Sequence, residues 1–209
     1  MTASAGIRDM YIKEIEREGM RELFATAPPS EPDGLTTIAD EFARTSAAEL
    51  IGTEFFDPRT SRSVRNGFAG PITWVLADSP TPDLGGVHMR GVAGAELDAI
   101  KLDGRAVGSV IRGPHATECL LAGIRADDTS VSRTEQARAT FEDIDRALQT
   151  VGMDFDNVVR TWLFLDDILD WYGEFNAVRN AKYGELGLMP SADQPSLRLA
   201  PGDRALLPA

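Results

Sequence analysis

The sequence has little of what disulfides, metal sites and membrane spans require. Its single cysteine, Cys119, excludes an intramolecular disulfide, and its two histidines, His88 and His115, do not by themselves build a convincing metal site. No stretch approaches the roughly eighteen apolar residues of a membrane span, and the start "MTASAGIRDMYIKEIEREG" has no apolar core of signal-peptide length. We therefore expect a cytoplasmic protein with no metal and no cofactor.

Positive charge is also scarce. Lys and Arg number 21 against 33 Asp and Glu, which gives a formal net charge of −12 and a pI near 4.6. Such a chain repels a phosphate backbone, and no basic stripe with interleaved aromatics offsets the repulsion. Nucleic acid and anionic membranes are thus poor partners, and a small-molecule substrate is the better expectation.

What the sequence does contain is an ordinary globular composition with one strong helix signal. Of the 209 residues 43% are hydrophobic, enough for one sizeable core or two small ones. In "SRTEQARATFEDIDRALQTVG", Ser132 and Glu135 form a capping box and Gly152 supplies the stop. Between these ends, apolar residues recur at helical spacing and form one stripe, which predicts a helix with this face packed on a sheet. The stripe consists of Ala137, Phe141, Ile144, Leu148 and Val151.

The next stretch alternates over "NVVRTWLFLDD", with both faces largely apolar, and predicts a central strand over 157–167. A second helix is expected from Ile168 to Leu186, capped by Asp166 or Asp167 and closed by Gly187. Its predicted buried residues are Ile168, Tyr172, Phe175 and Val178.

Elsewhere, turn signals separate shorter elements. Strands are expected at 20–27, in "PITWVLAD" and "VHMRGVAG", and in a hairpin of "GRAVGSVIRG" and "ATECLLAGIR" around Gly113-Pro114. A helix beginning near Leu35 is expected to stop at Gly52, and the tail after Pro190 offers two short strands. This order predicts a mixed sheet with helices on one face, which is an α+β or an α/β sandwich. The first half reads as a degenerate half-repeat of the second, giving units 1–103 and 104–209.

The stretch "RTEQARATFEDIDRALQTVGMDFDNVVRTWLFLDDILDWYGEFNAVRNAKYGE" resembles the central motif of the Rid (YjgF) family. The matching features are the Glu-Gln opening, a glycine before "DNVVRT" and the helix containing "NAVR". The resemblance covers about residues 104–209. The wording "LDDILDWYGEFN" and the weaker unit ahead of it look more like the tandem branch that includes chorismatase-like proteins.

This resemblance implies a chorismate mutase-like α+β fold, a sheet backed by two helices, and homo-oligomers in which a trimer is favoured. It also implies hydrolysis of reactive imines or enamines to a carbonyl compound and ammonia. Chorismatase-like relatives instead hydrolyse chorismate, and other members have no established catalysis. Both an enzyme of specialised metabolism and a non-catalytic ligand-binding or scaffold protein therefore stay open.

Three family positions are retained, namely Gly123, Arg160 and Asn176, whereas "PSAD" stands where the family arginine is expected and "DRALLPA" lacks the terminal carboxylate. An imine hydrolase needs a cation for the substrate carboxylate and an acid for the departing amine. The candidate catalytic residues are Glu118, Cys119 and His115, and the candidate substrate-binding residues are Arg112, Arg160, Asn176, Arg198 and Gly123. Each also has a structural reading: the arginines as solvated strand ends, His115 as a surface turn residue, and Cys119 as a small buried hydrophobe.

Overall fold

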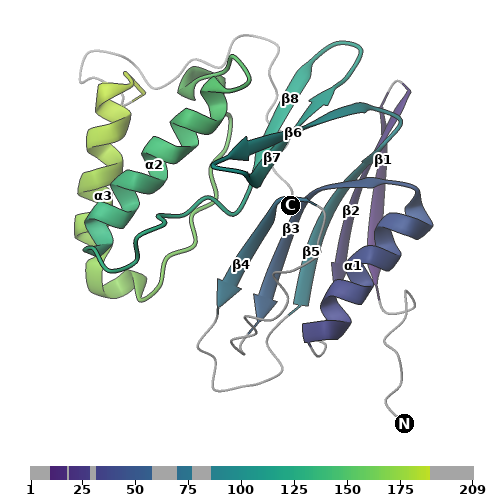
Figure 1. The fold of residues 1–209 in the computed structure, drawn as a ribbon, viewed down its shortest axis with the longest axis horizontal. Helices are drawn as coiled ribbons and strands as arrows, with labels where there is room; N and C mark the ends of the chain where they lie inside the picture. The colour runs from purple at the N-terminus through teal and green to yellow at the C-terminus, as the bar shows by residue number, and fades with distance from the viewer. Residues whose placement is uncertain (1–9, 18, 29–31, 58–69, 77–85, 189–209) are drawn as a thin grey trace.

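The computed structural model of this chain describes residues 10–17, 19–28, 32–57, 70–76 and 86–188. Two sheets lie next to each other, and each is covered by helix on one side (Figure 1). The described residues thus form an α+β architecture, and the predicted fold class is confirmed.

Sheet A has the strand order β1-β2-β5-β3-β4 and is mixed, because β3 and β4 run parallel whereas the other neighbours are antiparallel. Its strands are β1 (Tyr11–Arg17), β2 (Met20–Ala27), β3 (Glu49–Asp57), β4 (Ile72–Leu76) and β5 (Gly86–Ala93). Helix α1 (Pro32–Ser46) covers one face. It buries a core that includes Leu23, Ala25, Ile38, Phe42, Phe55, Val87 and Met89.

Sheet B is an antiparallel β6-β7-β8 meander with helices α2 and α3 on one side (Figure 1). Its elements are β6 (Glu96–Leu102), β7 (Arg105–Arg112), β8 (Thr117–Leu121), α2 (Arg133–Gln149), the short 3-10 helix η3 (Phe155–Asn157) and α3 (Ile168–Glu185). The core between α2, α3 and the sheet includes Ala137, Phe141, Leu148, Phe155, Phe175 and Val178.

The two sheets are joined by an apolar cluster and by one close backbone approach. Met20, Ile51 and Val92 of sheet A are buried with Ile111 of sheet B, and Leu120 packs against them. After β8, the Gly123 N–H donates to Thr73 Oγ1 at 2.9 Å. Gly123 has φ +66°, and a Cβ there would lie 1.9 Å from the carbonyl oxygen of Ile72. Only glycine allows the chain to pass β4 at this distance.

The predicted helix from the capping box is confirmed as α2. Ser132 Oγ accepts from the Glu135 backbone N–H at 3.3 Å, and Glu135 Oε2 accepts from the Ser132 backbone N–H at 3.0 Å. The side-chain and backbone hydrogen bonds from Ser132 hold the pKa of Glu135 below its usual value, because they stabilise the ionised carboxylate. The capping box predicted the start of α2 correctly because all of its groups lie within one helical turn.

The predicted central strand at 157–167 is wrong. Its first residue, Asn157, ends η3, and residues 158–165 join no ladder within the described ranges. Leu163 and Leu165 pack against the α2–α3 core, while Val159 and Trp162 face solvent. Strand pairing depends on neighbouring strands, which alternation within one segment does not reveal.

Helix α3 begins at the expected residue, but two of its expected contacts are wrong. Phe175 and Val178 are buried, whereas Ile168 and Tyr172 are exposed, because non-helical angles at Trp171 kink the first turn. Asp167 takes the N-cap position without making a side-chain cap bond. Its carboxylate instead accepts from Arg133 Nη2 at 2.9 Å, which ties the start of α3 to the start of α2.

In the first half, the strands at 20–27 and in "PITWVLAD" and "VHMRGVAG" are confirmed, and so is the hairpin around Gly113-Pro114. The expected helix to Gly52 is wrong, because α1 ends at Ser46 and Gly52 lies within β3 next to a bulge, in contact with Leu120. Strands β1 and β6 were not predicted, and the tail strands fall outside the described residues. The half-repeat and the boundary at 103/104 stay predictions, and the β6–β7 hairpin spans that boundary.

Candidate functional site

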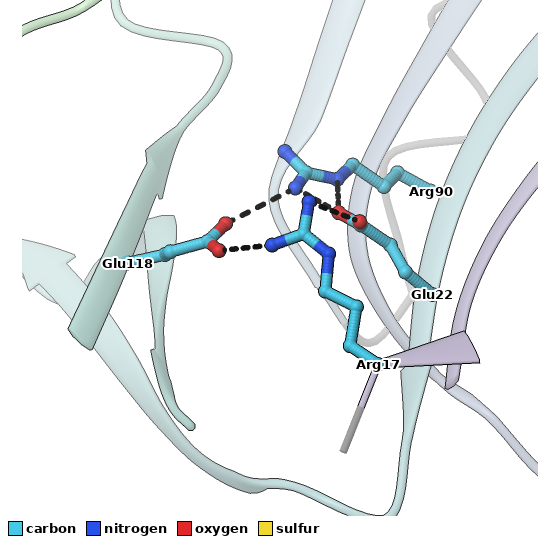
Figure 2. Close-up of polar contacts among 4 residues, drawn as sticks. All are labelled: Arg17, Glu22, Arg90 and Glu118. Carbon is cyan, nitrogen blue, oxygen red and sulfur yellow. Dashed lines mark hydrogen bonds and ion pairs between the residues drawn. The ribbon is translucent and has the colours of Figure 1, made fainter. Parts of the chain in front are cut away.

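Four charged side chains meet where the two sheets face each other (Figure 2). Arg17 comes from the end of β1, Glu22 from β2 and Arg90 from β5, whereas Glu118 comes from β8 of the other sheet. We call these four residues the charge cluster. In it, strands of sheet A and of sheet B contribute ionised groups to one place.

Within the charge cluster, each arginine bridges both carboxylates. Arg17 Nη1 donates to Glu118 Oε1 at 2.7 Å, and Arg17 Nη2 lies 3.2 Å from Glu22 Oε2. Arg90 Nε donates to Glu22 Oε1 at 2.8 Å, its Nη2 makes a second contact with the same oxygen, and Nη2 lies 3.4 Å from Glu118 Oε2. The Arg17–Glu22 contact is an ion pair rather than a directed hydrogen bond, because Glu22 Oε2 is buried without a hydrogen-bond partner. The result is a closed ring of alternating charge.

Burial divides this ring into an inner and an outer part. The Glu22 side chain is 3% exposed, against 26% for Arg90, 37% for Glu118 and 49% for Arg17. A buried carboxylate must be paired to be tolerated, so Glu22 fixes the two guanidinium groups. The outer faces of Arg17, Arg90 and Glu118 remain accessible to a ligand. Of the charge cluster, Arg17 also lines a surface hollow of about 350 Å³ at the β1–β2 turn, together with Glu16, Gly19, Met20 and Arg21.

Strand register produces this convergence. Glu22 pairs with Ile15 on one side and Val92 on the other, and Phe24 pairs with Arg90. Alternate residues of a strand share a face. Leu23 and Met89 pack on the α1 side of sheet A, so Glu22 and Arg90 lie on its other face, and that face is directed toward sheet B. The hairpin of sheet B brings Glu118 across from that face, opposite Ile111 in its own sheet.

Of the residues predicted to be catalytic, Glu118 alone joins the charge cluster, since Cys119 points into the core between β8 and the helices. His115 lies exposed in the β7–β8 turn. Burial raises the pKa of Cys119 to about 11, so its thiol stays protonated at neutral pH. This environment suits the alternative reading of Cys119 as a buried hydrophobe.

Alkylation rates test this reading of Cys119. At pH 8 we expect native protein to react with iodoacetamide about 100-fold more slowly than urea-unfolded protein, because a thiol with the raised pKa supplies far less thiolate. Mass spectrometry of the modified chain gives both rates. A native rate within threefold of the unfolded rate would contradict the buried, protonated thiol.

The residues predicted to bind substrate do not gather at one point. Arg112, at the end of the central strand β7, donates to Asp98 Oδ2 at 3.0 and 2.8 Å, and both side chains are exposed. The Arg160 guanidinium lies 4.4 Å from the centroid of the Trp162 ring. Asn176 lies on α3 with Oδ1 buried and without a hydrogen-bond partner. Gly123 serves the close approach to β4, and Arg198 lies outside the described residues. Their roles in binding stay predictions.

Sequence reasoning missed Arg17, Glu22 and Arg90. A usable signal was present, because Glu22 interrupts the apolar strand "MRELFATA" and Arg90 interrupts "VHMRGVAG". A charge inside such a strand needs a partner when it is buried. The partner was not readable, since Glu22 and Arg90 lie 68 residues apart.

A second hollow, of about 530 Å³, lies by α3 and is lined by Thr161, Leu163, Arg179, Asn180 and Tyr183. It offers the Arg179 cation, the Asn180 amide and the Tyr183 hydroxyl but no carboxylate. In the described ranges, no group of three or more His, Cys, Asp or Glu side chains is arranged to hold a metal ion. Within those same ranges, no helix combines the length and apolarity needed to cross a membrane.

Comparison with known proteins gives one family. Searches of curated proteins and of solved structures returned no match. A family model described as Endoribonuclease L-PSP matches residues 122–194, the region that starts just after β8 and contains α2 and α3. The described α+β fold, with two helices packed on a sheet, is consistent with the chorismate mutase-like fold of that family. Residues 122–194 of this chain are similar to the Endoribonuclease L-PSP family, the Rid (YjgF) family that the sequence resembles.

Proposed function

We propose that this Rid-type protein binds a small carboxylated metabolite at the charge cluster and hydrolyses a reactive imine or enamine there. The observation that carries the proposal is the convergence of Arg17 and Arg90 on the partly exposed Glu118. Two guanidinium groups that already hold a carboxylate can exchange it for the carboxylate of a ligand, because the planar fork of arginine suits either one.

In this mechanism Arg17 and Arg90 take the substrate carboxylate and release Glu118. Water adds to the carbon of the protonated C=N group, and the Glu118 carboxylate accepts the proton that the water loses. Glu118 then donates this proton to the amine nitrogen, and the C–N bond breaks to release ammonia. The Glu118 carboxylate takes the remaining hydroxyl proton as the C=O bond of the carbonyl compound forms. A single carboxyl group thus acts as base and then as acid, a role common to glutamates in hydrolytic sites.

The alternative is a non-catalytic ligand-binding or scaffold protein, and one observation favours it. The charge cluster is balanced by its own two arginines and two glutamates, so it can serve to hold sheet A against sheet B without any ligand. We also propose, from the sequence resemblance, membership of the chorismatase-like branch and a role in specialised metabolism. Division into units 1–103 and 104–209, assembly as a homotrimer and a cytoplasmic location are further proposals from the sequence.

Turnover of imines generated in situ tests the proposal. An amino-acid oxidase supplies 2-imino acids, semicarbazide traps the imine that escapes hydrolysis, and absorbance reports the trapped product. We expect wild type to lower trapping, Arg90→Lys to reduce kcat/KM by about 10- to 100-fold through loss of the fork, and Glu118→Gln to reduce it by about 100-fold or more.

The matched control is Arg146→Lys, since Arg146 also bridges two carboxylates, Asp103 and Asp143, but on an exposed surface away from the charge cluster. Its activity should stay within twofold of wild type. Chorismate, followed by product chromatography, is the second substrate and tests the chorismatase-like alternative. Absence of turnover with the imines and with chorismate would exclude the enzyme proposal for these substrates and favour the non-catalytic alternative.

A further inference from the structure

The hollow of about 530 Å³ beside α3, which we call the α3 hollow, lies apart from the charge cluster. Its lining comes from the segment 158–165 and from α3, and consists of Thr161, Leu163, Arg179, Asn180 and Tyr183. Helix α3 packs on the side of sheet B to which Cys119 points. Glu118, the preceding residue of β8, points to the other side, where it meets Arg17. The α3 hollow thus shares no residue with the charge cluster, whose Glu118 faces away from α3.

Arg179 is a half-buried cation that no described carboxylate neutralises. Its Nε and Nη2 both donate to Asn180 Oδ1, at 3.4 and 3.2 Å, and within the described ranges no Asp or Glu forms an ion pair with it. Carboxylates are nevertheless in surplus, with 33 Asp and Glu against 21 Lys and Arg. Lys182 of the same helix does have such a partner, because its Nζ lies 3.8 Å from Asp145 Oδ2. The remaining N–H groups of the Arg179 guanidinium are therefore available to a ligand.

Neutral hydrogen-bonding groups complete the α3 hollow. The Tyr183 ring packs edge-to-face on Phe141 of the core, with ring centroids 6.1 Å apart, and its hydroxyl lies 3.4 Å from Thr161 Oγ1. When one of these hydroxyls donates to the other, the second proton remains free for a ligand. Asn180 accepts from Arg179 through Oδ1, so its amide N–H groups remain as donors. The lining thus offers one positive charge and several neutral donors, but no negative charge.

From this arrangement we propose that the α3 hollow is a second ligand site, which binds the carboxylate of a small metabolite. The carboxylate accepts from the free N–H groups of Arg179 and from the neutral donors beside it, because guanidinium and carboxylate match in shape and charge. One guanidinium charge balances a monoanion, whereas a phosphate dianion would add uncompensated negative charge to a chain whose net charge is −12. Leu163 supplies an apolar contact for the rest of the ligand. This site does not depend on catalysis at the charge cluster.

NMR titration of isotope-labelled protein with sodium acetate tests this inference, at neutral pH and at an ionic strength held constant with sodium chloride. We expect saturable shifts of the Asn180 side-chain amide and of the Arg179 Nε–H signal. Arg179→Met should weaken the acetate affinity reported by the Asn180 amide by about 10-fold or more, because it removes the charged donor and keeps an unbranched side chain. Arg138→Met, which removes an exposed cation of α2, should change this affinity less than twofold. Sodium phosphate, titrated in parallel, should bind more weakly than acetate.

The outcomes separate this site from the charge cluster. Arg90→Lys should leave the acetate affinity at Asn180 within twofold of wild type. Shifts that do not saturate in wild type would overturn the inference even if Arg179→Met fails to fold, as would an unchanged affinity in the folded variant. Tighter binding of phosphate than of acetate would overturn the carboxylate assignment. Saturable binding at Asn180 without imine hydrolysis contradicts only the enzyme proposal, whereas hydrolysis without this binding contradicts only the second site.

Discussion

Gly123→Ala is expected to lower the free energy of unfolding by about 3 kcal/mol. The added Cβ would lie 1.9 Å from the Ile72 carbonyl oxygen, a backbone atom that cannot rotate away, and φ +66° is itself unfavourable for alanine. The chain after β8 must then separate from β4, with loss of the bond from the Gly123 N–H to Thr73 Oγ1. Thermal denaturation should show a decrease of about 6–12 °C in Tm for a protein of this size.

Gly152→Ala is the matched control for this variant. Gly152 has φ +72° at the end of α2, but a Cβ there would meet no atom within 4 Å. It isolates the cost of the left-handed backbone, about 1 kcal/mol. If the two variants lose equal stability, the close approach of Gly123 to β4 contributes nothing, and the retained glycine has only a conformational role.

Arg90→Met is expected to lower the free energy of unfolding by about 3–5 kcal/mol. The variant keeps much of the apolar stem but removes the main partner of Glu22, whose side chain is only 3% exposed. Arg17 then remains near Glu22, through the contact that lacks hydrogen-bond geometry. The cost arises from a buried charge left without compensation and not from the loss of a favourable pair. Urea denaturation followed by circular dichroism measures it.

A second substitution identifies this cause. Adding Glu22→Gln to Arg90→Met removes the uncompensated charge and should recover more than half of the lost stability. Arg146→Met, which breaks exposed ion pairs with Asp103 and Asp143, should cost no more than about 1 kcal/mol. A double variant no more stable than Arg90→Met alone would show that Glu22 does not depend on Arg90.

The parts of the fold that were readable from sequence are those whose determinants lie close together in the chain. The Ser132–Glu135 capping box lies within one helical turn, and the turn at Gly113-Pro114 joins adjacent strands of a hairpin. Turn chemistry and helical periodicity act over such distances, so α2 and the β7–β8 hairpin followed from the sequence.

The parts that were not readable depend on distant partners. Residues 158–165 have the alternation of a strand, but a strand also needs a neighbour, and none joins them within the described ranges. Gly52 reads as a helix stop, yet it lies in β3 where a bulge and the contact with Leu120 favour a small residue. In both cases the structure depends on distant parts of the chain, which the local pattern does not contain.

The candidate site divides in the same way. Glu118 was predicted as a polar group that could stand in for the missing family residues, whereas its partners Arg17 and Arg90 come from the half of the chain with the weaker resemblance. The sequence shows that these residues are charged, but it does not show how the strands pair, and strand pairing is what brings the side chains together.

The apolar cluster between the sheets also affects how the chain folds during synthesis. Sheet A is complete once residue 93 has been made, and Glu22 can already pair with Arg90 at that stage. The apolar side chains that face sheet B, however, stay uncovered until Ile111 and Leu120 have been synthesised; they are Met20, Ile51 and Val92. Glu118, the partner of Arg17, is synthesised 101 residues after it. Contacts of such long range form slowly, and an uncovered apolar sheet face is prone to aggregate in the interval. The early presence of Arg17 and Arg90 beside that face keeps it charged while the second sheet is being made.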